Sequence, residues 1–153
     1  MEQLTLMTTA LQQAKLAEQL GEVPVGALLV DGSGRLIAKS HNLTIQQCDP
    51  TAHAEINVIR QACKKLKTER LEGMTLYVTL EPCPMCATAI SFARIKQVYY
   101  GAYDPKGGGI DHGPYIYDQE TCHHKPTVMG GVMEKECSKI LEDFFKEKRN
   151  LSQ

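Results

Sequence analysis

The chain carries no excess of charge of either sign and contains no long apolar run. Its 17 Lys and Arg residues stand against 18 Asp and Glu residues, which argues against a large sequence-independent contact with phosphate groups. A few local cations could still hold nucleic acid. No apolar stretch is long enough to span a bilayer, and residues 1–9 lack the basic start and apolar core of a signal peptide. We therefore expect a cytoplasmic protein without membrane contact.

Internal repeats, low-complexity tracts and linkers are also absent. A chain of 153 residues, 42% of them hydrophobic, can bury the core of one compact domain but is short for two. We predict one domain over residues 1–153. A reducing cytoplasm argues against a disulfide framework among the six cysteines. Four of them are interpreted as small buried or incidental residues: Cys48, Cys63, Cys122 and Cys137.

Hydrophobic periodicity predicts helices and short strands in alternation. We expect helices over residues 4–21, 49–67, 83–93 and 133–149, and strands over residues 25–30, 35–40, 75–80, 97–101 and 127–129. The second helix is predicted to open at Asp49-Pro50, with Asp as cap and Pro at the first position. A helix between two short strands favours parallel pairing. The order predicts one α/β sandwich.

Three further expectations concern packing. Gly26 stands inside the first predicted strand, which indicates a bulge or the close approach of another group. The second helix is expected to bury a stripe at helical spacing, made of Ile56, Ile59, Cys63 and Leu66. In the last helix Phe144 falls on the predicted core stripe, whereas Phe145 lies off it and is the better candidate for stacking on a base.

The chemistry-bearing residues fall in two short motifs. His53-Ala54-Glu55 and Pro82-Cys83-Pro84-Met85-Cys86 each begin a predicted helix. Three ligands, His53, Cys83 and Cys86, leave a zinc ion the open fourth position that a catalytic site needs. Glu55 is placed to act as proton carrier without being a ligand. The pattern H-x-E followed by P-C-x-x-C is typical of zinc-dependent base deaminases.

Each half of this pattern alone has other interpretations. C-x-x-C also occurs in thioredoxin-like redox sites and in structural zinc sites, and a glutamate in the first turn of a helix can simply complement the helix dipole. A non-catalytic, zinc-stabilised interaction module is therefore an alternative, and it would require a fourth protein ligand. The glycine run at residues 107–109 does not predict a phosphate loop, because neither a preceding strand nor a Gly-Lys-Ser/Thr accompanies it.

Over nearly its whole length the chain resembles the cytidine deaminase superfamily, and within it the bacterial tRNA-specific adenosine deaminases. The resemblance rests on segments 22–27, 41–42, 49–55, 77–86 and 100–106, on His124, and on segment 136–149. It implies a three-layer α/β/α sandwich with a mixed five-stranded sheet. It also implies a homodimer whose subunits complete each other's sites.

The activity implied by the resemblance is hydrolysis of adenosine to inosine at the wobble position of a tRNA anticodon. His53, Cys83 and Cys86 would bind one zinc ion per subunit, and Glu55 would move the proton from the zinc-activated water. The family's substrate contacts fall on Asn42, the backbone at Ala54, Asp104, Lys106, Phe145 and Arg149. A deaminase of a free base or nucleoside, such as guanine or cytosine, would use the same metal motif and is the main alternative.

Two segments depart from the commonest family pattern. These are residues 107–114 and His123, at which the family often has Asn. The segment His123-His124-Lys125 is compatible with a second metal site, an RNA-binding patch or a solvated basic loop. The departures affect the expected loop contacts to RNA and leave the zinc motif intact.

Overall fold

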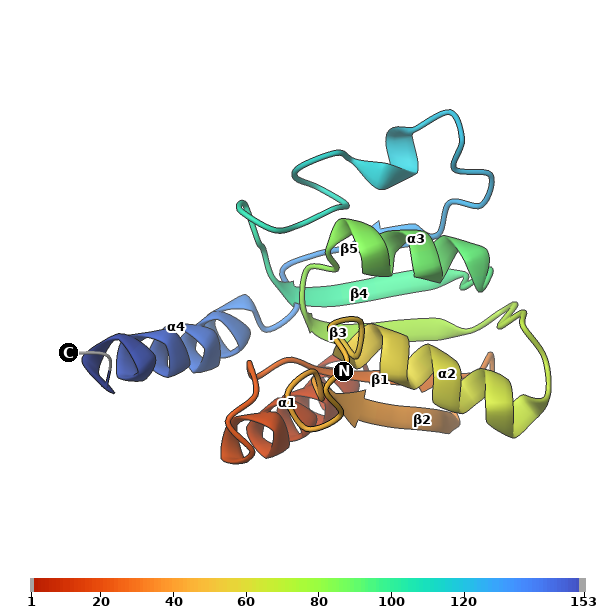
Figure 1. Ribbon diagram of the computed structural model, residues 1–153. Helices are drawn as coiled ribbons and strands as arrows, with labels where there is room; N and C mark the ends of the chain where they lie inside the picture. Colours follow the sequence, from red (N-terminus) through yellow and green to blue (C-terminus); the bar gives the residue numbers. More distant parts are fainter. Residues whose placement is uncertain (1, 152–153) are drawn as a thin grey trace.

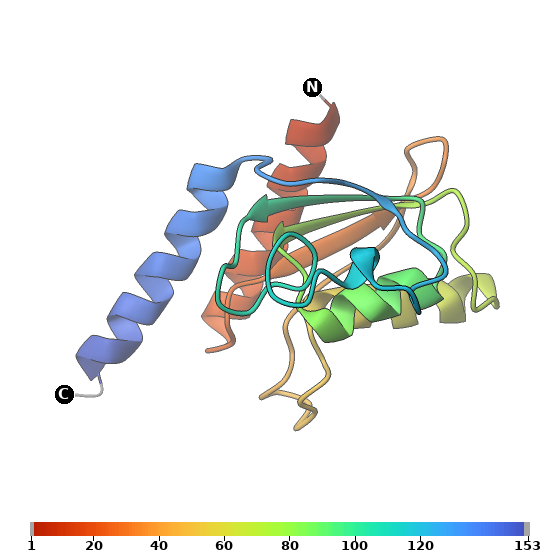
Figure 2. The ribbon, with the colours of Figure 1, turned by 90° about the horizontal axis from the view of Figure 1, so that it is seen from above.

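The computed structural model describes residues 2–151, which form a five-stranded sheet between two layers of helices (Figure 1). Helices α2 and α3 lie side by side on one face, and α1 lies on the other (Figure 2). The elements in chain order are α1 (Glu2–Gln19), β1 (Gly26–Val30), β2 (Leu36–His41), α2 (Ala54–Leu66), β3 (Thr75–Leu80), α3 (Pro84–Phe92), β4 (Gln97–Ala102), the 3-10 turn η1 (Ile116–Asp118), β5 (Thr127–Met129) and α4 (Glu134–Leu151).

The sheet has the order β2-β1-β3-β4-β5 and is mixed. Strand β1 pairs antiparallel with both β2 and β3, while β3, β4 and β5 run parallel. The predicted α/β/α sandwich with a mixed five-stranded sheet is thus confirmed. Because α3 connects two parallel strands, its N-terminus lies at the carboxyl ends of those strands. Ligand sites of α/β sheets form at this edge.

Gly26 explains how closely α1 packs on the sheet. A Cβ added at this residue would meet the carbonyl oxygen of Ala10 and would lie 2.5 Å from the backbone nitrogen of Ala14. Both atoms belong to the backbone of α1, which cannot move aside without shifting the whole helix. The predicted close approach at Gly26 is confirmed, and the approaching group is a helix.

The predicted start of the second helix is wrong. Helix α2 begins at Ala54 with His53 as its N-cap, and the Asp49 carboxylate instead accepts hydrogen bonds from the Thr51 N–H and hydroxyl at 2.9 and 2.7 Å. Asp49 therefore closes a turn ahead of the helix. A local Asx turn is the alternative that aspartate always offers to a cap.

The predicted core stripe of this helix is also wrong. The residues that α2 buries are Ala54, Glu55, Asn57, Val58 and Ala62. The predicted residues Ile56, Ile59 and Cys63 are half-buried, and Leu66 is exposed. The apolar side chains that α2 buries are small because the helix lies close to the sheet. Ile59 and Cys63 line the margin of α2 toward α3.

Helix α4 packs on β4 and then extends beyond the sheet (Figure 1). It buries Cys137, Leu141 and Phe144, whereas Phe145 is 44% exposed. The predicted difference between the two phenylalanines is confirmed. Within residues 2–151 no helix is both long and apolar enough to cross a membrane.

Replacing Gly26 with Ala should lower the free energy of unfolding. Overpacking of a well-packed interface typically costs about 1–3 kcal/mol, and here the obstacle is backbone. Urea unfolding of the variant measures the loss. Gly32→Ala is the matched control, because a Cβ there would have its nearest neighbour at 3.8 Å. Equal stability of the two variants would contradict the packing explanation.

Candidate metal centre and active site

Two helix N-termini meet at one point, and each is capped by a potential metal ligand. His53 is the N-cap of α2 and Cys83 is the N-cap of α3; both have extended backbone, and neither side chain makes a capping hydrogen bond. These side chains are therefore free to face each other. The unpaired N–H groups of the two first turns create a positive potential that favours thiolates.

The three predicted ligand atoms are close together. His53 Nδ1 lies 3.6 Å from Cys83 Sγ and 3.6 Å from Cys86 Sγ, and all three atoms lie within 4.8 Å of one another. A tetrahedral zinc ion with Zn–N of about 2.0 Å and Zn–S of about 2.3 Å requires an N···S separation of about 3.5 Å. The residues thus fit a zinc ion without rearrangement.

Across residues 2–151, no fourth His, Cys, Asp or Glu side chain joins this group. Closed structural zinc sites have four protein ligands, whereas catalytic sites have three and an open position. A group of three candidate ligands matches the donor number of a catalytic site. Within the described chain, neither His123 nor His124 belongs to a second cluster of candidate ligands.

The pKa values of the two cysteine thiols in the centre shift in opposite directions. Hydrogen bonds from Cys86 and His53 to its sulfur lower the pKa of Cys83 to about 4, although burial opposes the shift. The same contact with Cys83 raises the pKa of Cys86, and burial adds to that rise. The hydrogen bond to Cys83 also raises the pKa of His53. Zinc takes cysteine as the thiolate, so zinc binding would release any proton that Cys86 carries.

Glu55 lies in the first turn of α2 and is only 4% exposed. Burial raises the pKa of its carboxyl to about 7, and the negative charge of Cys83 adds to the rise. A hydrogen bond with Cys86 places the carboxyl beside the metal ligands. A buried carboxyl with a pKa near neutrality, adjacent to a three-ligand centre, has the properties of a general acid–base.

Asn42 joins the end of β2 to the start of α2. Its side-chain oxygen accepts a hydrogen bond from the Ala54 N–H at 2.9 Å, and its side-chain nitrogen donates to the Val23 carbonyl at 3.1 Å. This residue therefore holds the helix end that carries His53 and Glu55. One hydrogen of its amide group and one lone pair remain for a substrate, so the predicted substrate contact stays a prediction.

Two fully buried carboxylates fix the loops on either side of the centre. No role was predicted for either of them from the sequence. Glu22 accepts hydrogen bonds from the backbone of Ile45 and Gln46 and from the Thr44 hydroxyl, at 2.8 to 3.2 Å. It thereby anchors the loop between β2 and α2. Its sequence signal is an acid beside the apolar Val23-Pro24-Val25, but no local pattern indicates its partners, which lie more than 20 residues away.

Glu81 anchors the loop after β4. It accepts hydrogen bonds from His112 Nδ1 at 2.7 Å and from the backbone N–H groups of Asp104, Ile110 and Asp111 at 2.9 to 3.3 Å. The glycine run packs against this carboxylate, since a Cβ at Gly108 would meet its Oε2 atom. The glycines thus allow close approach and do not form a phosphate loop.

This loop and helix α4 together bring three predicted RNA contacts into one depression. Asp104, Lys106 and Phe145 line a cavity of about 570 Å³, together with Val23, Leu80, Ala102, Tyr103, Gly107, Ser138, Leu141 and Glu142. Arg149 is exposed in the last turns of α4 and does not line it. The structure thus groups part of the predicted set and leaves Arg149 apart.

Replacing Glu81 with Gln should destabilise the fold and loosen the loop. The amide would turn an N–H group toward backbone donors, and a buried donor without an acceptor costs about 1–3 kcal/mol. Urea unfolding and proteolysis of the 104–112 segment measure the two effects. Glu72→Gln is the matched control, because Glu72 is 68% exposed and pairs only with the exposed Arg70. No difference between these variants would contradict an anchoring role for Glu81.

Comparison with known proteins agrees with this geometry. The family model for MafB19-like deaminases matches residues 1–149. The tRNA-specific adenosine deaminase of Agrobacterium fabrum is 55% identical over 148 residues, covering 97% of each chain. That of Bacillus subtilis is 50% identical over 143 residues, covering 94% of this chain and 88% of its own.

Solved structures similar to this chain are also deaminases. A structure from studies of A-to-I editing by tRNA:A34 deaminases has a TM-score of 0.88 and 55% identity, and covers 90% of this chain and 99% of its own. A guanine deaminase from Bacillus subtilis has a TM-score of 0.62 and 32% identity, covering 95% and 92%. By whole-chain identity to these relatives, the chain belongs to the MafB19-like deaminases and, among them, to the family of tRNA-specific adenosine deaminases.

Proposed function

We propose that this protein is a single-domain enzyme that hydrolyses adenosine to inosine at the wobble position of a tRNA anticodon. The observation that carries the proposal is the contact between the three-ligand centre and a buried carboxyl, Glu55. The relatives named above supply the substrate, since they are called tRNA-specific adenosine deaminases at 50–55% identity. The guanine deaminase is more distant, at 32% identity.

His53, Cys83 and Cys86 would hold one zinc ion per subunit. When bound there, zinc supplies a Lewis acid that makes a water molecule acidic enough to attack a ring carbon at neutral pH. Glu55 takes the proton from the attacking water and passes it to the adenine ring and then to the departing amino group. Adenosine and water thus become inosine and ammonia.

Substrate contacts would surround this centre. The Ala54 backbone and the remaining amide hydrogen of Asn42 face the flipped nucleoside, while the depression lined by Asp104, Lys106 and Phe145 takes neighbouring parts of the anticodon loop. Phe145 is exposed in the depression and so is available for stacking on a base. Arg149 would reach a phosphate group farther along the loop.

A second copy of the chain would cover the margin between α2 and α3. Phe92 is 75% exposed, and it lines a cavity of about 770 Å³ with Ile59, Cys63 and Ala89. An exposed apolar margin of this kind is typical of a subunit interface. We propose it as the contact of a homodimer. A cytoplasmic location, where tRNA is processed, is part of the same proposal.

Loss of a zinc ligand and loss of the Glu55 carboxylate should differ in their effect on zinc content, although both should lower the deaminase activity. Cys83→Ser should lose both the metal and the activity. Glu55→Gln should keep one zinc per subunit but lose activity by a factor of about 100 to 10,000, the usual contribution of a general acid–base. Metal analysis and inosine formation measure both. Cys48→Ser, which changes an exposed cysteine, is the control, and an active Glu55→Gln enzyme would exclude the proposed chemistry.

The substrate is tested with an anticodon stem-loop that carries wobble adenosine, offered beside free adenosine, guanine and cytidine. We expect inosine in the RNA and no conversion of the free compounds, because the contacts to Asp104, Lys106 and Phe145 require a polynucleotide. Conversion of a free base with unchanged RNA would assign the centre to small-molecule deamination instead.

A further inference from the structure

A basic hollow lies at the end of the sheet opposite the metal centre. It has a volume of about 550 Å³ and is lined by Arg70, Glu72, Gly73, Arg94, Lys96, His124, Lys125 and Thr127. Helix α3 separates the two sites, since its N-cap is Cys83 and its C-cap, Ala93, precedes Arg94. The segments that line the hollow meet where α3 ends and β4 begins, and these ends of the two elements lie on the right in Figure 1.

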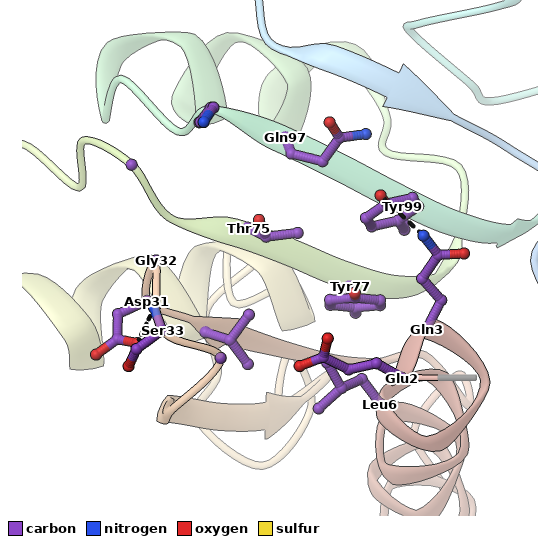
Figure 3. A pocket seen from close by; sticks show the side chains of 14 residues that line it. Glu2, Gln3, Leu6, Asp31, Gly32, Ser33, Thr75, Tyr77, Gln97 and Tyr99 are labelled. Carbon is purple, nitrogen blue, oxygen red and sulfur yellow. Dashed lines mark hydrogen bonds between the residues drawn. The ribbon is translucent and has the colours of Figure 1, made fainter.

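The hollow adjoins a second, polar cavity of about 480 Å³ on the other face of the sheet (Figure 3). Gly73 and Lys96 line both cavities. The polar cavity is lined by the acids Glu2 and Asp31. Asp31 accepts hydrogen bonds from the Ser33 N–H and hydroxyl, and it forms an ion pair with Arg35. Its charges are mixed, whereas those of the basic hollow have predominantly one sign.

Of the four cations of the basic hollow, one is paired with an acid, and within residues 2–151 the other three are not. Its single acid, Glu72, pairs with Arg70 at 3.4 Å. Within residues 2–151 no ion pair joins Arg94, Lys96 or Lys125 to an acid. Four cations and one acid give the lining a charge of +3, in a chain whose net charge is −1. A local excess of this kind attracts a polyanion.

The walls of the hollow are fixed by hydrogen bonds between segments far apart in the chain. The His124 ring bonds the Ile95 carbonyl at 2.7 Å, and the Ser91 hydroxyl donates to the His124 carbonyl at 2.6 Å. The Thr127 N–H donates to the Lys96 carbonyl at 3.0 Å. Lys125 and Lys96 are thus held on adjacent backbones, and a preorganised site loses less entropy when a ligand binds.

Arg94 is placed by an unfavourable backbone conformation. Its φ is 63°, a left-handed value that costs energy for any residue with a Cβ and that helix ends usually assign to glycine. The Arg94 N–H and the Ala93 carbonyl are both bonded, to Ser91 and Leu71 respectively. The conformation is therefore fixed, and it directs this unpaired cation to the hollow.

We propose that the basic hollow binds phosphate groups of the tRNA outside the anticodon loop. The inference rests on the proposed function, which makes a tRNA the substrate. Strand β3 has six residues and spans about 20 Å between the two ends of the sheet. The nucleotide at the metal centre cannot bridge that distance, whereas the backbone of a folded tRNA extends much farther.

The test is the double variant Arg94→Gln with Lys125→Gln. Its affinity for full-length tRNA should fall, and the slope of log K against log salt should become shallower by about 2, one for each lost phosphate contact. Affinity for a short oligonucleotide of the anticodon loop should stay at the wild-type value. Lys15→Gln with Lys39→Gln removes the same charge from exposed positions elsewhere, and should behave like the wild type.

Equal affinity and salt slope in the hollow variant and the control variant would overturn the inference. If the substitutions weaken the binding of polyglutamate but leave the binding of tRNA unchanged, the inference is also overturned. The hollow would then be a site for an acidic protein. If Arg94→Gln disturbs the end of α3, Lys96→Gln with Lys125→Gln gives the same test. Wild-type protein that binds tRNA through the hollow but forms no inosine would refute the proposed function alone.

Discussion

The structure depends on the meeting of two helix N-termini at the carboxyl end of the parallel part of the sheet. His53 and Cys83 occupy the N-cap positions of α2 and α3, and neither side chain caps its own helix. The caps therefore face each other, 3.6 Å apart, where both helix ends favour negative charge. Fold and chemistry share this constraint, because moving either helix would separate the ligands.

The loops around this centre are held by buried carboxylates and not by regular structure. Glu22 and Glu81 each accept at least three hydrogen bonds, mainly from loop backbone. A carboxylate provides two oxygens with several lone pairs, so one side chain can satisfy donors that no strand or helix serves. The loop that carries Asp104 and Lys106 is thereby rigid enough to present a defined surface to a substrate.

The sequence predicts the parts of this arrangement whose signals are local. The metal ligands, Glu55, the strands and the close approach at Gly26 each follow from a short pattern. The start of α2 was mispredicted because Asp49 can close a turn as well as cap a helix. The α2 stripe was mispredicted because Ile56, Ile59 and Leu66 are larger and more apolar than Ala54 and Ala62, whereas the helix face that packs close to the sheet buries Ala54, Val58 and Ala62. The partners of Glu81 lie beyond any local signal.

The net charge of the whole chain says little about the charge at any one place on this protein. A value near zero argued against extensive phosphate contact, but the fold brings Arg70, Arg94, Lys96 and Lys125 to one hollow from three separate segments. Apart from Glu72, the chain's acids do not line the hollow, and at 0.15 M salt charges interact over only about 8 Å. A polyanion at the hollow therefore responds to the +3 of its lining. The relevant quantity for nucleic-acid binding is the local charge that the fold assembles.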